Sequence, residues 1–162
     1  MIVVAIIGIL AAIAVPAFTL SQLKAKKAEA FSVVSGIGDA EVAYMTANDA
    51  WIEGASNPGG ALTKVARSWD TTKTGWKDLG FSPDGPVRCS YVTACQGGSG
   101  GSCTGANVYI KVTATCDVDN NATGSAASQG TANITYAVDN GQRVCCGSNP
   151  RGEIVDANPA VY

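Results

Sequence analysis

The sequence predicts an α+β fold in which one long N-terminal α-helix packs on a head built around an antiparallel four-stranded β-sheet. First, residues 1–51 keep a helical spacing of apolar side chains with no strong turn signal between them. Second, apolar and β-branched residues from residue 87 onward form short segments bounded by turn-forming residues. Third, the composition changes, because Gly, Ser, Thr, Asn and Ala dominate from about residue 55. The 162 residues suffice for one domain with a core and an appendage.

The chain begins with a wholly apolar segment, Met1 to Phe18, which holds no charged or strongly polar side chain. As a helix it spans about 27 Å, close to the hydrocarbon thickness of about 30 Å of a bilayer. Its insertion into a membrane is worth roughly −3 to −6 kcal/mol. We expect the segment to lie in a bilayer or in a core formed by other copies of itself. The side chains expected to form this surface are Ile2, Val3, Val4, Ile6, Ile7, Ile9, Leu10, Ile13, Val15 and Phe18.

Two other interpretations of this segment are weaker. A cleaved signal peptide would use Ala12-Ile13-Ala14 as its small-residue cleavage site, but no basic n-region precedes the apolar run. A core helix of a soluble domain would show a polar face, whereas this segment is apolar all round. A membrane or a self-made core is therefore the favoured environment.

After the apolar segment the sequence becomes amphipathic and keeps its helical period, which predicts one helix of about fifty residues. Residues 1–25 are predicted to protrude, and residues 26–50 are predicted to pack on the head. The predicted packing stripe comprises Ala30, Val33, Val34, Ile37, Ala40, Tyr44 and Trp51. The charged residues predicted to lie on other faces are Lys24, Lys26, Lys27, Glu29, Asp39 and Glu41.

Gly8 and Pro16 are helix breakers within the apolar segment. Pro16 lacks the N–H that would bond to the carbonyl of residue 12, and glycine has a low helix propensity. We expect the helix to be kinked or partly melted between them. A simple kink, which membrane helices tolerate, and a segment that can unwind and stretch both fit the sequence.

Residues 51–86 are predicted to form a loop region. Turn-forming residues cluster at 57–60 and 82–86, and a short helix is predicted between them at 61–68. Three tryptophans lie in or beside this region, and we expect them to anchor its packing rather than bind a ligand. They are Trp51, Trp69 and Trp76.

Residues 87–162 are predicted to hold the β-sheet and a cysteine-rich C-terminal region. The first three strands are expected at 87–95, 107–118 and 131–139, where β-branched and aromatic residues alternate with polar ones. Asn140-Gly141 predicts a type I′ hairpin turn into a fourth strand at 142–146. One face of the sheet is expected on the helix and the other toward solvent.

All six cysteines lie in the C-terminal half of the chain: Cys89, Cys95, Cys103, Cys116, Cys145 and Cys146. Their even number in a Gly-rich domain predicts disulfides and an oxidising compartment, and no C-x-x-C pair suggests a zinc site. Cys95 and Cys103 flank a Gly/Ser loop and are predicted to pair locally. The adjacent cysteines at 145 and 146 point to opposite faces of a strand, so we expect Cys89 and Cys116 as their partners. This is one of fifteen possible pairings.

Several classes of chemistry are disfavoured. The chain has no histidine, which excludes Ser-His-Asp and Cys-His catalysis and His-ligated metals. The segment beginning at Asp117 resembles a calcium loop, but Ala122 and Ser128 replace the required Gly and Glu. A net charge of −2 gives no basic surface for nucleic acid. We therefore expect no enzymatic activity, no cofactor, no metal and no specific nucleic-acid binding.

The apolar run MIVVAIIGILAAIAVPAF, followed by a basic amphipathic continuation, resembles the N-terminal helix of type IV pilins. The resemblance is nearly residue for residue over Met1 to Phe18, including the placement of Gly8 and Pro16. By about Met45 only the pattern of apolar and polar residues still resembles that of the family. The resemblance implies a long helix packed on an antiparallel sheet, a variable loop between them and a disulfide-bounded C-terminal region. In such filaments the helix is typically melted between the positions of Gly8 and Pro16.

The resemblance implies a structural subunit that polymerises through its N-terminal helix into an extracellular pilus used in adhesion, twitching motility or DNA uptake. The implied partners are other copies of the chain, the bacterial inner membrane before assembly, and the pilus assembly machinery. The alternative is a pseudopilin of type II secretion, a component of a periplasmic piston. The major form of that class typically binds calcium, which the broken pattern at Asp117 disfavours.

The chain departs from the family pattern at its start. Pilins normally begin six residues earlier with a methylated Phe after a short basic leader. They carry a Glu two residues before the position of Met1, which pairs with a neighbour's N-terminal amine. Lys24, Lys26 and Lys27 alone would place the head in the cytoplasm, whereas the cysteines favour an oxidising side. We therefore expect a processed or truncated N-terminus, the alternative being assembly without that Glu.

Overall fold

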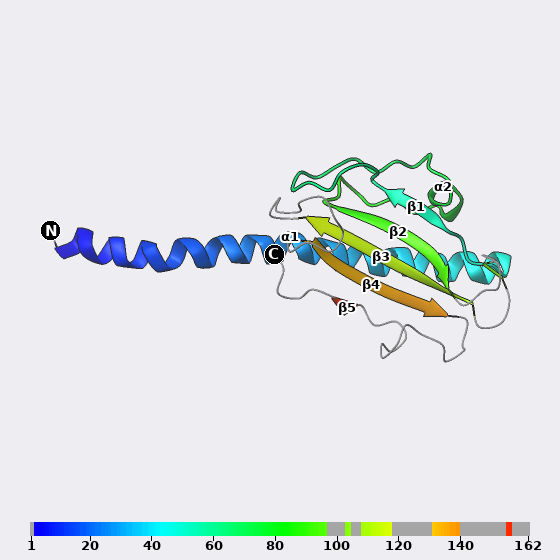
Figure 1. The fold of residues 1–162 in the computed structure, drawn as a ribbon, viewed down its shortest axis with the longest axis horizontal. Helices are drawn as coiled ribbons and strands as arrows, with labels where there is room; N and C mark the ends of the chain where they lie inside the picture. The colour runs from blue at the N-terminus through cyan, green and yellow to red at the C-terminus, as the bar shows by residue number, and fades with distance from the viewer. Residues whose placement is uncertain (1, 97–102, 105–107, 118–130, 140–154, 157–162) are drawn as a thin grey trace.

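The computed structural model describes residues 2–96, 103–104, 108–117, 131–139 and 155–156. Its dominant element is helix α1, Ile2–Asn48, which has 47 residues. The C-terminal half of α1 lies against an antiparallel sheet, whereas the N-terminal half projects away from it (Figure 1). The predicted α+β class, with a long N-terminal helix on an antiparallel sheet, is confirmed.

Helix α1 is unbroken through Gly8 and Pro16, so the expected melting between these residues does not occur in this conformation. A proline removes one backbone hydrogen bond, and the bonds on either side of it can still form. The Thr19 hydroxyl also donates to the Pro16 carbonyl oxygen at 2.9 Å. At its other end the helix stops before Asp49, whose φ of 54° is left-handed and whose N–H bonds to the Met45 carbonyl oxygen at 2.9 Å.

The sheet places its strands in the order β1-β2-β3-β4-β5, and each strand is antiparallel to its neighbour. The bounds are β1 Gly54–Asn57, β2 Cys89–Gln96, β3 Tyr109–Asp117, β4 Thr131–Asp139 and β5 Val155–Asp156. The described sheet thus has three long strands, close to the three predicted first, and two short flanking ones. The prediction of four strands is corrected accordingly, and its fourth strand at 142–146 lies outside the described residues.

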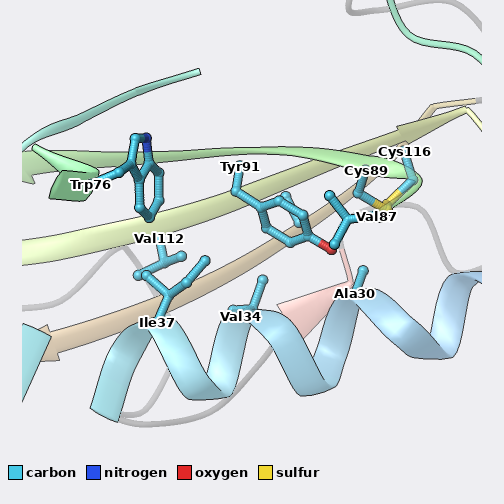
Figure 2. Close-up of a cluster of buried hydrophobic side chains, with 10 residues drawn as sticks. Ala30, Val34, Ile37, Trp76, Val87, Cys89, Tyr91, Val112 and Cys116 are labelled. Carbon is cyan, nitrogen blue, oxygen red and sulfur yellow. A yellow bond between two sulfur atoms is a disulfide. The ribbon is translucent and has the colours of Figure 1, made fainter. Parts of the chain in front are cut away.

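The main core lies between α1 and the inner face of β2 and β3 (Figure 2). Antiparallel pairing sets Tyr91 opposite Ala114 and Thr93 opposite Val112, so alternate residues of both strands face the helix. Helix α1 contributes residues at steps of four and three, as the predicted stripe requires. The buried members are Ala30, Val34, Ile37, Trp76, Val87, Cys89, Tyr91, Val112, Ala114 and Cys116.

Two charged residues lie on this buried helix face, contrary to the sequence prediction. Lys27 is 3% exposed and Glu41 is fully buried. Both continue the spacing of Ala30, Val34 and Ile37, so helical geometry directs them toward the sheet whatever their polarity. The prediction placed them on other faces because it assumed that a charge on an amphipathic helix points to solvent.

A second, smaller core closes the C-terminal end of α1. It contains Trp51, Val108 and Ile110, with Met45 and the Cys95–Cys103 disulfide packed against them. The Trp51 indole N–H donates to the Val108 carbonyl oxygen at 3.1 Å, and its backbone N–H donates to the Cys103 carbonyl oxygen at 3.0 Å. Trp51 therefore acts as a packing anchor, although it lies beyond the helix.

The region between α1 and β2 contains β1 and a short helix α2, Trp76–Leu79, rather than the helix predicted at 61–68. Arg67 instead forms a two-way backbone bridge with Val87, with both N···O distances 2.8 Å. Such pairing requires extended backbone, which excludes a helix at that residue. Trp69 packs edge-on against Trp76, with ring centroids 4.9 Å apart, so these tryptophans also serve packing.

Two disulfides join described residues. Cys95 pairs with Cys103 as predicted, with Cα atoms 5.6 Å apart. Cys89 pairs with Cys116, with Cα atoms 4.3 Å apart, so the predicted partners of these two were wrong. The cause is strand register, because Cys89 and Cys116 lie directly opposite each other on β2 and β3. Cys145 and Cys146 lie outside the described residues.

Candidate functional site: the exposed apolar segment of helix α1

The first part of α1 carries an apolar surface that no described part of the chain covers. All ten large apolar side chains predicted for this surface are exposed, with exposed fractions between 52% for Ile6 and 78% for Ile2. They are Ile2, Val3, Val4, Ile6, Ile7, Ile9, Leu10, Ile13, Val15 and Phe18. Gly8 is likewise open, because a Cβ built there meets no described atom outside its own helical turn within 4 Å. We term residues 2–18 the apolar handle.

Contact with the head begins only after the apolar handle ends. Among the side chains that the structure describes, those from Ile2 to Gln22 are all exposed, and Leu23 is the first that packs against the core. From Lys27 to Glu41 a buried residue recurs every three or four positions. The helix is therefore divided into a free part and a docked part, and Figure 1 shows the free part as a straight extension beyond the sheet.

Exposure of these apolar side chains to water is unfavourable in free energy. Full burial of a large aliphatic or aromatic side chain contributes about 1.5–3 kcal/mol, so ten of them leave roughly 15–30 kcal/mol of burial unrealised, as an upper bound. Contiguous apolar surface of this size marks a membrane or protein interaction site. In the described part of the chain, one helix, α1, is long and apolar enough to cross a membrane.

The docked half of α1 is fixed to the head by polar and steric contacts. The Glu29 carboxylate accepts two hydrogen bonds from Arg88, from the backbone N–H at 3.2 Å and from Nη1 at 2.9 Å. Gly36 lets the Phe81 ring approach the helix, since a Cβ at this position would lie 3.1 Å from Phe81 Cε2. These contacts set the direction in which the apolar handle leaves the head.

Other groupings in the described residues offer little chemistry. Glu53 lies close to Cys95 and Cys103, but both sulfurs are consumed in their disulfide and provide no thiolate. An open groove lies between α1 and residues 81–87, and its apolar lining includes Val33, Phe81 and Val87. The residues after Asp117 that would complete the calcium-like pattern lie outside the described part of the chain.

Sequence reasoning placed the acid Glu41 on another face of the helix and so missed its burial in the docked half. Its position was predictable from spacing alone, because it lies four residues after Ile37 and eleven after Ala30, on the same helix face. Burial raises the pKa of its carboxyl from 4.5 to about 7, and hydrogen bonds from Ile52 and Thr93 offset part of that effect.

Comparisons of this chain with known protein families, with curated proteins and with solved structures found no match. The functional assignment therefore rests on the chain's own sequence and geometry.

Proposed function

We propose that this chain is the structural subunit of a type IV pilus, a fibre assembled from many copies through their apolar handles. The observation that carries the proposal is the division of α1 into an uncovered apolar handle and a docked amphipathic half. A handle of this kind needs a solvent other than water, and a bundle of identical handles supplies one. The head, whose core is complete without the handle, then forms the outer sheath.

Storage in a membrane fits the same geometry. The handle is about as long as a hydrocarbon core is thick, and the first charged residues after it are Lys24 and Lys26. Lysines at that position can contact lipid headgroups while their stems follow the apolar boundary. We infer that the subunit waits in the bacterial inner membrane and that the pilus assembly machinery transfers it into the fibre.

Gly8 and Pro16 gain a role only in the assembled state. Both residues are helical in the isolated chain. We therefore propose that the melting implied by the family resemblance takes place only when the subunit enters the fibre. Loss of helix between them would lengthen the handle, because extended backbone rises about 3.3 Å per residue against 1.5 Å in a helix. The resulting extracellular pilus would serve adhesion, twitching motility or DNA uptake. The proposal includes no catalytic role and no specific nucleic-acid binding.

The location of the chain tests the proposal. Cells that produce it are sheared, and the chain is quantified by mass spectrometry in the sheared surface fraction and in the envelope fraction. A pilus subunit is expected in both, and electron microscopy with an antibody to the head should label long surface fibres. Presence in the envelope alone, with no labelled fibres, would instead support a type II secretion pseudopilin.

A further inference from the structure

Glu41 places a carboxyl group in the interface between α1 and the sheet, far from the apolar handle. The side chain is fully buried. Its Oε2 accepts a hydrogen bond from the Ile52 backbone N–H at 3.4 Å, which is a long bond. Its Oε1 is buried and has no hydrogen-bond partner among the described residues. A buried carboxylate oxygen without a donor is destabilising, so its protonation state matters for the fold.

Thr93 on β2 completes a small polar cluster around this carboxyl. The Thr93 Oγ1 accepts a hydrogen bond from the Gly54 N–H at 2.6 Å. Its single proton can go either to the Ile52 carbonyl oxygen, 3.1 Å away, or to the Glu41 carboxylate. The cluster joins three parts of the head: the docked half of α1, the connection 49–53, and the first pair of strands.

Counting protons shows that this cluster prefers the neutral acid. With Glu41 ionised, its carboxylate and the Ile52 carbonyl compete for the one Thr93 proton, and Oε1 stays unpaired. With Glu41 protonated, no charge is buried, and the Thr93 hydroxyl can donate to the Ile52 carbonyl oxygen without competition. Burial of Glu41 is therefore less unfavourable when its carboxyl carries a proton.

No described side chain offsets the ionised form. The inward side chains next to Thr93 and opposite it are Tyr91 on β2 and Ile110 and Val112 on β3, and none is a cation. Strand β4 also contacts α1, but its ionisable residues are Tyr136 and Asp139, and it contains no Lys or Arg. Tyr91 directs its hydroxyl toward Val87 and Ala30 (Figure 2). Lys111 lies between two inward residues of β3 and so belongs to the opposite face of the sheet.

The charged side chains of the connection, residues 49–53, are both acids. Asp49 is exposed at the end of α1, and Glu53 is exposed with its Oε1 accepting the Cys95 backbone N–H at 2.9 Å. Both would repel an ionised Glu41. On α1 itself, Asp39 is another exposed acid, while the buried Lys27 lies fourteen residues away, about 21 Å along the helix.

We propose that Glu41 is a proton-controlled latch, closed as the neutral acid, that holds the α1–β1 connection against the sheet and loosens it when ionised. Opening would release the Ile52 and Gly54 N–H groups and weaken the seating of Trp51. The latch is a property of the head and stands independently of whether the chain forms a pilus.

The sign of the pH effect follows from linkage. In the closed latch the Glu41 pKa is about 7, and on opening it returns toward 4.5. Between these values the open state binds fewer protons, so rising pH favours opening by about tenfold per pH unit. The opening equilibrium should therefore grow on the order of 100-fold between pH 5 and pH 8 and level off above pH 7.

Hydrogen exchange of the full chain in detergent micelles tests the latch. Exchange of the segment 49–57 is compared between wild type and Glu41→Gln at matched pH values, which cancels the intrinsic pH dependence. The amide keeps the shape of the acid, cannot ionise and provides donors. The ratio of wild-type to variant exchange is expected to rise on the order of 100-fold from pH 5 to pH 8. A ratio independent of pH would overturn the proposal.

Two further measurements separate the latch from general effects. Glu53→Gln removes an exposed acid from the same connection, and its exchange should keep the wild-type pH dependence. If Glu41→Gln fails to fold, the Glu41 carboxyl can be titrated in the wild-type chain by carbon NMR. An apparent pKa near 7 would support the latch, and a value near 4.5 would overturn it.

Discussion

Glu29 of α1 accepts both the backbone N–H and the side-chain Nη1 of Arg88, at 3.2 and 2.9 Å. This pairing ties the docked half of α1 to the residue that precedes β2. Both side chains are partly exposed, at 27% for Glu29 and 33% for Arg88. Because the backbone N–H takes part, the contact depends more on Glu29 than on Arg88.

Replacing the two partners should therefore have unequal effects. Glu29→Ala leaves two donors of Arg88 without their acceptor and should lower the free energy of unfolding by about 1–2 kcal/mol. Arg88→Ala removes only the side-chain contact and should cost under about 1 kcal/mol. Urea unfolding of the full chain in micelles, followed by tryptophan fluorescence, measures both. A larger loss for Arg88→Ala would contradict the predicted order.

Alanine substitutions at two glycines can distinguish the cost of a left-handed backbone from the cost of a steric clash with the added Cβ. Gly75 has a φ of +84°, and a Cβ there would lie 2.1 Å from the Glu53 carbonyl oxygen. Gly80 has a φ of +69°, with nothing within 4 Å of a Cβ. Gly80→Ala should cost about 1–2 kcal/mol, the price of a left-handed residue with a side chain. Gly75→Ala should cost clearly more or prevent folding, and equal melting temperatures for the two variants would refute this.

The two disulfides should differ in their reactivity. Cys89 and Cys116 are fully buried, whereas Cys95 and Cys103 are partly exposed. Thiol exchange requires access of the attacking thiolate to sulfur, so graded reduction should open the Cys95–Cys103 bond first. Alkylation of the freed thiols followed by peptide mass spectrometry reports the order. Labelling of Cys89 or Cys116 before Cys95 and Cys103 would show that burial does not govern their reduction.

A charge on the apolar handle should block assembly without unfolding the head. Ile9 and Val65 are equally exposed, at 64% and 63%, but Ile9 lies on the handle and Val65 on the head. An aspartate at the centre of an apolar membrane helix costs about 2.5–3.5 kcal/mol, and it would be buried again in a bundle of handles. Ile9→Asp should abolish surface fibres and Val65→Asp should retain them, as counted by electron microscopy.

The same pair of variants checks that the handle is independent of the head. Neither Ile9 nor Val65 is buried in the chain, so the melting temperature of the head should change by less than about 2 °C in both. A large loss of head stability in Ile9→Asp would mean that the handle supports the head, contrary to the observed exposure.

The helix was readable from the sequence because its signals are local. A run of eighteen residues without a charge has few other interpretations, and the later stripe keeps a period of three and four. Glu41 and Lys27 were misplaced because polarity was given more weight than spacing. In this helix the position of a residue on the docked face determines whether its side chain is buried, even where the side chain is charged.

The sheet was only partly readable because its details depend on partners distant in sequence. Gly54–Asn57 has the sequence GASN, with low strand propensity, and is a strand because it pairs with β2. The Cys89–Cys116 bond likewise follows from the register of β2 on β3. That register depends on how the intervening segment closes, which composition does not specify.

The candidate site itself was readable in composition, and the structure adds what no pattern could supply. The sequence alone left open whether the head covers residues 2–18. Their exposure shows that within the described chain it does not. What covers them in the cell is the central claim to be tested.

Helical reconstruction by cryo-electron microscopy of purified surface fibres tests that claim most directly. The predicted result is a map whose axis is filled by residues 2–18 of neighbouring copies, with the heads arranged outside. Fibres in which residues 2–18 face solvent, or fibres built from a different chain while this one stays in the envelope, would contradict it.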